Sequence, residues 1–158
     1  MADLSKKRQS ATDLFFWVPS VASTAYEVGD LLYLNSGTAT LASSQADGGT
    51  EAANQATFAD NFLGVCGSPK LVSDATTADI GVSAEGVFNY PCDSTTWAVG
   101  EYVAACENAG GTGLEKQKVK KSATRADAIG ECIKAGAALT EVRFVLYSRF
   151  NKPLTPGT

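Results

Sequence analysis

The chain has no histidine in its 158 residues. Serine and cysteine hydrolases use histidine as the base that activates the nucleophile. The chain also lacks a phosphate-binding loop, because the glycine-rich stretch NAGGTG at 108–113 is not followed by the Lys-Ser/Thr pair of such a loop. These absences predict that the protein is not an enzyme and uses no cofactor.

Charged residues are scarce, at 19% of the chain, and the net charge is −4. Nucleic-acid-binding proteins usually present a strongly basic face, so an acidic chain argues against that class. No apolar run approaches the ~20 residues that a membrane-spanning helix needs. The N-terminal residues also lack the apolar core of a secretory signal. We therefore expect no nucleic acid and no membrane as partners, and synthesis in the cytoplasm.

Cysteine is present only four times, and no Cys-x-x-Cys pair occurs. A zinc site would require all four thiolates to converge from widely spaced positions. The cysteines stand in apolar, strand-like surroundings such as LGVCG, VAAC and GECI. We expect buried, reduced thiols and no metal site.

Alternation of apolar and polar residues is the main structural signal. Residues 80–90 and 141–150 alternate cleanly, as in strands with one buried face. Residues 31–42 read as a hairpin that turns at Gly37, where glycine permits positive φ. No stretch of ten or more residues shows a helical apolar stripe, and we expect only helical turns, at 51–55 and 123–127. The sequence predicts a mostly β protein with short connections.

The chain repeats one phrase. TAYEVGDLLYL at 24–34 is similar to TTWAVGEYVAAC at 95–106. In the strands that precede these stretches, Phe16 and Pro19 match Phe88 and Pro91. The Val-Gly-acid step in each copy predicts a corner that opens a hairpin, built by Gly29-Asp30 in one copy and Gly100-Glu101 in the other. Cys66 and Cys132 match further along. Two such units would share a core as a small barrel or sandwich built from two related halves.

We divide the chain on this basis into an arm, one β domain and a tail. The domain holds both pseudo-repeats and a closing strand. The predicted boundaries are 1–13 for an extended, flexible N-terminal arm, 14–150 for the domain, about 14–70 and 86–136 for the repeats, 141–150 for the closing strand, and 151–158 for the tail.

The stretches YEVGDLLYLNSGTATLA and WAVGEYVAA, with AIGECIKAGAALTEVRFVLYS further on, resemble tailed-bacteriophage capsid decoration proteins, also called cement proteins. The shared pattern is a Gly-acid hairpin start, a loop, a Φ-Gly-x-Ala/Cys strand and a closing alternating strand. The resemblance covers most of residues 16–150. It implies a structural virion protein without cofactor, often a homotrimer, that binds the major capsid protein on the outer surface of the assembled shell and stabilises it by bridging capsomers.

Residues 14–18, LFFWV, are apolar without alternation. Either both faces of this first strand are buried, or the segment docks on a partner. A basic group precedes it, and aromatic anchors are frequent in interfaces. The candidate contacts with a capsid or a neighbouring protomer are Leu14, Phe15, Phe16, Trp17, Lys6, Lys7 and Arg8.

Three other interpretations remain open. Asp30 and Glu101 could form a carboxylate pair of the kind that glycosidases use, although matching turn positions favour a structural role. The basic run EKQKVKK at 115–121 would either grip an acidic partner or protect an edge strand with lysines. The whole chain could also be a glycan-binding β-sandwich or another virion subunit such as a tail protein. Aromatic residues that would serve glycan binding are Trp17, Trp97, Tyr26 and Tyr90.

Overall fold

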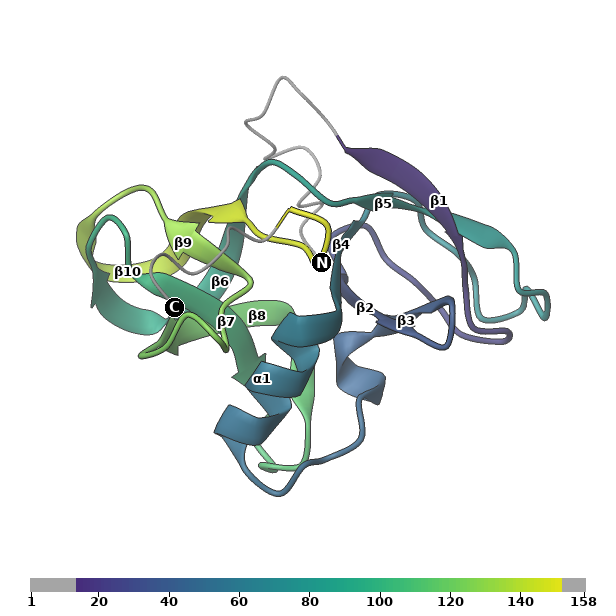
Figure 1. The fold of residues 1–158 in the computed structure, drawn as a ribbon, viewed down its shortest axis with the longest axis horizontal. Coiled ribbons are helices and arrows are strands. Elements are labelled where there is room, and N and C mark those ends of the chain that lie inside the picture. Colours follow the sequence, from purple (N-terminus) through teal and green to yellow (C-terminus); the bar gives the residue numbers. More distant parts are fainter. Residues whose placement is uncertain (1–13, 152–158) are drawn as a thin grey trace.

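The structure, a computed structural model, describes residues 14–151 and is built mainly of antiparallel strands (Figure 1). One five-stranded sheet has the order β1-β5-β4-β2-β3 and a second has the order β6-β10-β9-β7-β8. The predicted mostly β fold with two related, hairpin-containing halves is confirmed. The strands of the first sheet are β1 (Phe15–Pro19), β2 (Leu31–Asn35), β3 (Thr38–Leu41), β4 (Phe62–Cys66) and β5 (Asp79–Ser83); those of the second are β6 (Val87–Trp97), β7 (Tyr102–Glu107), β8 (Leu114–Ser122), β9 (Gly130–Cys132) and β10 (Gly136–Leu146).

The two sheets have the same topology. Adding five to each strand number of the first sheet gives the order of the second. The repeat therefore includes β5 and β10 as counterparts, one strand more than the predicted repeats of about 14–70 and 86–136. The strand assigned to the closing position at 141–150 is β10, which begins earlier, at Gly136.

The residue pairing is repeated as well. Phe16 lies opposite Val82 in the first sheet, and its counterpart Phe88 lies opposite Phe144 in the second. Likewise the β2–β4 pair Leu32 and Gly64 has its counterpart in the β7–β9 pair Val103 and Gly130. Equal register across several strand pairs fixes which residues of the two halves are equivalent.

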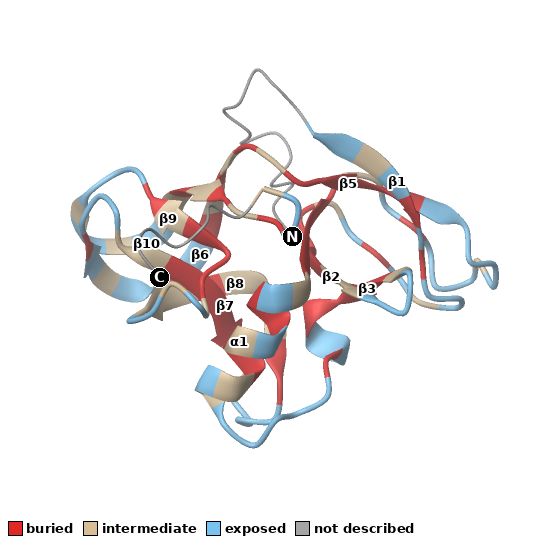
Figure 2. Cartoon of the chain, viewed as in Figure 1, coloured by how far each residue is buried: buried red, intermediate tan, exposed pale blue. Residues whose placement is uncertain are grey.

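One apolar core lies inside the first sheet and another inside the second. The first contains Leu32, Leu63 and Ile80. The second joins inner residues of the second sheet, such as Phe144, to Leu31 and Val65 of the first half. Figure 2 shows the buried residues concentrated where the halves meet, above the helix α1 (Glu51–Asn61). The halves thus share a continuous core.

Alternation over residues 80–90 predicted one strand, and that prediction is wrong. β5 ends at Ser83 and β6 begins at Val87, and the two strands belong to different sheets. The break falls at Gly86, whose φ is 133°. β6 alternates between buried and less buried residues up to Cys92, whereas the last four residues of β5 are all buried, so the apparent alternation over 80–90 does not come from one strand with one buried face.

The helical turns are also corrected. The predicted turn at 51–55 is the start of an eleven-residue helix, α1, whose N-cap Thr50 accepts a hydrogen bond from the Ala53 N–H at 3.2 Å. Around 123–127 the chain forms a turn closed by the Ala128 N–H and the Arg125 carbonyl, without a helix. A 3-10 helix, η2 (Ala42–Ser44), follows β3.

Two predictions for the aromatic strands change. The proline that ends β1 at Pro19 has its counterpart inside β6, at Pro91, because β6 runs on to Trp97. An edge strand tolerates proline where the missing N–H would face away from its neighbour. β1 itself is not buried on both faces, since only Val18 is buried among its five residues. No helix among residues 14–151 has the length and apolar character to cross a membrane.

Candidate interaction surface

The outer face of β1 carries an exposed aromatic pair, here called the aromatic strip, formed by Phe15 and Trp17. Phe15 is 42% exposed and Trp17 is 60% exposed. Their ring centroids lie 5.7 Å apart with an interplanar angle of 87°, an edge-to-face arrangement. The strip therefore presents a preorganised apolar surface on a rigid sheet rather than on a loop.

Glycines make room for the strip. A Cβ atom added at Gly81 or at Gly67 would overlap the Phe15 ring. Trp17 lies opposite Gly81 in the β1–β5 pair. The far end of the Phe15 ring therefore lies against the backbone of the sheet at Gly67 and Gly81, while part of the ring stays open to solvent.

The other face of β1 is apolar too. Leu14, Phe16 and Phe150 line a shallow hollow without polar lining. The rings of Phe16 and Phe150 make an edge-to-face contact at 5.4 Å. Phe150 is 56% exposed, so it only partly covers Phe16.

The equivalent surface of the second half carries no aromatic pair. The counterparts of Phe15 and Trp17 are Val87 and Asn89, since these residues pair with β10 as the aromatic residues pair with β5. Asn89 accepts a hydrogen bond from Arg143 Nε at 3.1 Å. The exposed aromatic pair is thus specific to the first half.

The Gly-acid corners predicted as turns have the same geometry in both halves. Gly29 and Gly100 have φ of 98° and 89°, and their N–H groups donate to the carbonyls of Cys66 and Cys132 at 2.9 and 2.8 Å. In each corner the acidic side chain accepts from the backbone N–H three residues earlier, at 2.8 Å for Asp30 and 2.7 Å for Glu101. Positive φ explains the glycine, and the local hydrogen bond explains the acid.

The two acids differ in their surroundings. Asp30 is fully buried and accepts from Lys116 Nζ at 3.2 Å and from Gln117 Nε2 at 2.8 Å, both in the second half. Glu101 is part-exposed and pairs with Lys121 of its own half at 2.8 Å. The first corner therefore joins the halves, whereas the second stabilises only one of them.

Burial and charge act in opposite directions at these acids. Burial raises the pKa of Asp30, and its hydrogen bonds with Glu27 and Gln117 only partly offset this effect. The Lys121 hydrogen bond and the Ala98 N–H lower the pKa of Glu101. The Tyr90 hydroxyl donates to the Gly29 carbonyl at 2.6 Å, and burial raises the pKa of Tyr90 well above its usual value. Each carboxylate has structural partners, and the two acids stand in different corners rather than facing each other as a catalytic pair.

The basic run 115–121 lies in β8, at the edge of the second sheet as the edge-strand interpretation expected. Its lysines are paired with carboxylates at distances from 2.7 to 3.2 Å rather than gathered into an anion-binding patch. Three of these five ion pairs connect the halves, two of them through Lys116 and one through Lys120. The pairs are Lys116 with Glu27 and Asp30, Lys118 with Asp93, Lys120 with Glu51, and Lys121 with Glu101.

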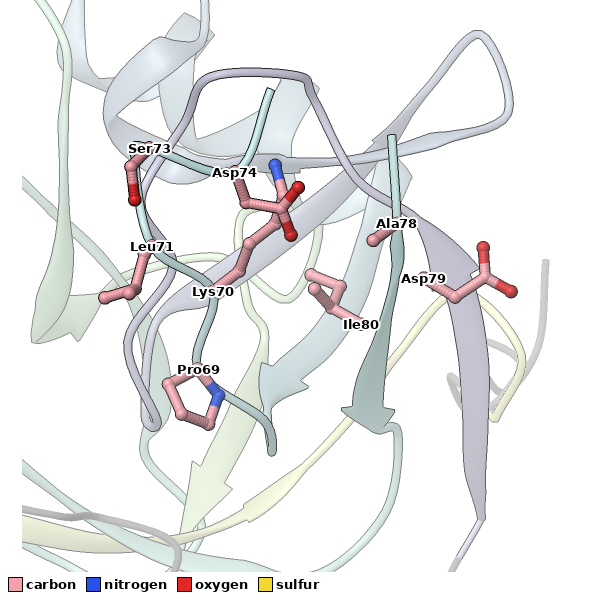
Figure 3. A pocket seen from close by; sticks show the side chains of 8 residues that line it. All are labelled: Pro69, Lys70, Leu71, Ser73, Asp74, Ala78, Asp79 and Ile80. Carbon is pink, nitrogen blue, oxygen red and sulfur yellow. The ribbon is translucent and has the colours of Figure 1, made fainter. Parts of the chain in front are cut away.

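A pocket beside β5 offers no set of catalytic groups (Figure 3). Lys70 is buried, its Nζ donates to the Val21 carbonyl at 2.7 Å, and it lies 5.7 Å from the Tyr26 ring centroid. Asp74 accepts from the hydroxyl of Thr76 at 2.6 Å, which lowers its pKa. Lys70 thus has structural partners at Val21 and Tyr26, and Asp74 has one within its own loop, at Thr76.

The four cysteines are buried and free, as expected. Burial raises the pKa of the Cys66 thiol to about 12, so it stays protonated. Among residues 14–151, no three His, Cys, Asp or Glu side chains are grouped so as to hold a metal ion.

Of the predicted contact residues, the structure brings together Phe15 and Trp17 on the exposed face of β1, while Leu14, just before β1, lines the hollow on the other face with Phe16, which packs against the first core. Lys6, Lys7 and Arg8 lie outside the described residues. Sequence reasoning missed the supporting glycines Gly67 and Gly81. The small residues within the FLGVCGS and ADIGVS stretches were the available signal for a close ring contact.

Comparison with protein-family models, with curated proteins and with solved structures found no match to this chain.

Proposed function

We propose that the protein is a non-enzymatic structural component of a tailed-phage virion, which binds the major capsid protein on the outer surface of the assembled capsid and stabilises it by bridging capsomers. The observation that carries the proposal is the aromatic strip of Phe15 and Trp17, held open on the rigid outer face of the first sheet. The resemblance to decoration proteins suggests the partner.

The form of the surface supports protein binding. The Phe15 ring is backed by Gly67 and Gly81 and also contacts the Trp17 ring, so it loses little conformational entropy on docking. Exposed apolar surface that persists on a folded protein often marks an interaction site. The corresponding surface around Asn89 shows that this fold does not itself require an aromatic pair here.

Stabilisation of the shell follows from linkage. A protein that binds only the assembled lattice lowers the free energy of that lattice by mass action. Many copies on one shell add their effects, and each contact between neighbouring capsomers resists their separation. The bound protein catalyses nothing in this mechanism.

The direct test adds purified protein to undecorated capsids and measures co-sedimentation and the temperature at which the capsids release their contents. We expect saturable binding and a higher release temperature. Trp17→Ala should weaken binding at least about tenfold, as for an interface anchor. Leu71→Ala is the matched control, because Leu71 is 73% exposed but stands away from the strip, in the pocket loop.

A glycan-binding module is the second candidate, favoured by the same exposed tryptophan on a sheet face. Binding of Trp17-containing protein to a glycan array without binding to capsids would replace the capsid proposal by this one. Capsid binding that is equal in wild type and Trp17→Ala would remove the strip as the contact while leaving the capsid as a partner.

A further inference from the structure

The outer edge of β1 is less well covered than the same edge in the second half. There, β8 spans nine residues and Lys118 pairs with Asp93 of β6 at 2.7 Å. In the first half, β3 spans only four residues. One isolated bridge joins it, at Ala39, to Ser20, the residue that directly follows β1. Among the described residues, no strand pairs with the outer edge over Leu14–Val18.

Hydrogen bonding shows which residues face this open edge. In the β1–β5 pair, the Leu14 carbonyl accepts from the Ala84 N–H, and the Ser20 N–H donates to the Ala78 carbonyl. Antiparallel partners alternate between bonded and non-bonded pairs, so the even-numbered residues of β1 bond to β5. The N–H and C=O groups of Phe15 and Trp17 therefore point outward, toward an absent neighbour.

Side-chain burial also differs between the two halves. Phe16 and Leu34 are only partly buried against the first core. Their counterparts, Phe88 and Ala105, are each 1% exposed in the second core. Phe88 is covered by the core that the halves share rather than by a strand paired to the outer edge of β6, whereas Phe16 lies outside that core and stays partly open.

The segments of the chain outside the described residues are poor candidates for that strand. Residues 1–13 contain five charged side chains and no alternation of apolar residues. Residues 152–158 contain Pro153 and Pro156, each of which lacks the N–H that a ladder requires. A strand from another molecule fits better.

We propose that β1 pairs with β1 of a second copy of this chain, antiparallel and across a two-fold axis. With Phe15 opposite the partner subunit's Trp17, the outward N–H and C=O groups of both residues find partners, and Pro19 is not needed as a donor. The stretch Leu14–Ser23 carries no charge, so two chains of net charge −4 can meet here without repulsion between the paired segments. Aromatic residues directly opposite each other also stabilise an antiparallel pair.

The contact is small. If a fully buried aromatic side chain hides about 200 Å², the exposed fractions of 42% and 60% correspond to about 200 Å² per copy. Even complete burial of these rings in both copies would hide only about 400 Å², well below the ~1,200 Å² of a stable standard interface, and pairing at the strand edge leaves the outer faces of the rings open. The association should therefore be weak and should depend on concentration.

The test measures mass by sedimentation equilibrium from about 5 to 500 μM, a range that spans weak dissociation constants. Wild-type mass should approach twice its low-concentration value. Trp17→Pro removes one outward N–H and should abolish the doubling, whereas Leu71→Ala should behave as wild type. Circular dichroism checks that each variant is folded.

Cross-linking tests the register. A bonded antiparallel pair places its Cα atoms about 5.5 Å apart, within disulfide range, whereas diagonal neighbours lie about 7–8 Å apart. An equal mixture of Phe15→Cys and Trp17→Cys should form a disulfide between residues 15 and 17 under mild oxidation, at least tenfold faster than Trp17→Cys alone. Leu71→Cys controls for random collision.

A constant wild-type mass over the whole range would overturn the proposal, as would doubling that persists in Trp17→Pro. Protection of Trp17→Cys from alkylation only after capsids are added, with a constant mass, would assign the edge to a capsid strand instead. That outcome would refute self-pairing and leave the proposed function standing, so the two ideas fail separately.

Discussion

The two halves of the molecule share a topology and a register but differ in what their equivalent surfaces touch. Val65 is 1% exposed because it belongs to the core shared by the halves, whereas its counterpart Glu131 is part-exposed. Phe15 and Trp17 are open to solvent where the second half has Val87 and Asn89. The two halves thus share their backbone geometry, whereas the type and exposure of each side chain depend on what it contacts.

This comparison separates architecture from function. Features present in both halves, such as the Gly-acid corners, are needed to build the unit. Features present in only one half arise either from contact between the halves, as at Asp30, or from contact with something outside, as we propose for the aromatic strip.

The largest expected effect is at the shared glycines. A Cβ at Gly64 would overlap the Ser83 carbonyl, and a Cβ at Gly130 would overlap the Val145 carbonyl. Gly64→Ala and Gly130→Ala should each lower the free energy of unfolding by about 3 kcal/mol, measured by urea denaturation. Gly113→Ala, which makes only an ordinary contact, should cost far less. Equal losses at Gly113 and Gly64 would show that close backbone approach is not the cause.

A smaller and unequal effect is expected at the corner acids. Asp30→Asn places an amide NH2 against the Lys116 and Gln117 donors, so we expect a loss of about 2 kcal/mol. Glu101→Gln breaks a part-exposed pair and should cost less than about 1 kcal/mol. Urea denaturation at neutral pH measures both. A larger loss at Glu101 than at Asp30 would contradict the assignment of Asp30 to the contact between halves.

The helix α1 is inserted in the first half between β3 and β4, where the second half has a loop between β8 and β9. Thr50 caps the helix through its hydroxyl. Thr50→Ala should destabilise the protein by about 1 kcal/mol, and Thr50→Ser should restore most of the loss. Thermal unfolding measures the difference. No effect of Thr50→Ala would mean that other contacts hold this end of the helix.

The corner acids should also differ in their pH dependence. The raised pKa of Asp30 means that the pH-linked part of its contribution is full below the unfolded pKa of 3.8 and is lost as pH rises through the folded value, while the hydrogen bonds from Lys116 and Gln117 remain at neutral pH. The lowered pKa of Glu101 means that its contribution is present above 4.5 and is lost as pH falls through the folded value. Unfolding of wild type, Asp30→Asn and Glu101→Gln between pH 3 and 7 should therefore give difference curves of opposite slope. Slopes of the same sign would contradict the contrast in burial.

Much of the architecture could be predicted from the sequence because alternation and the Val-Gly-acid corner are local signals. The hairpin at Gly37 and both corners depend on backbone conformations that glycine favours at neighbouring positions. The length of α1 could not be predicted, because most of its stability comes from packing of Phe58 in a core formed by distant strands.

The candidate surface was only partly predictable. LFFWV marked the segment, but burial on both faces and docking on a partner give the same pattern of residues. The outcome depends on the short β3, on Gly81 beneath the Phe15 ring and on the lack of a strand paired to the outer edge of β1 among the described residues. These are long-range relations between strands, which a local pattern does not contain.

The most direct test of the account replaces the aromatic strip with the residues that the second half has at the same positions. The double variant Phe15→Val/Trp17→Asn keeps strand-compatible residues, so it should stay folded by circular dichroism. The measurement is its co-sedimentation with undecorated capsids beside wild type and Leu71→Ala. The account predicts that the folded double variant loses capsid binding while Leu71→Ala keeps it; binding by the double variant at the wild-type level would contradict it.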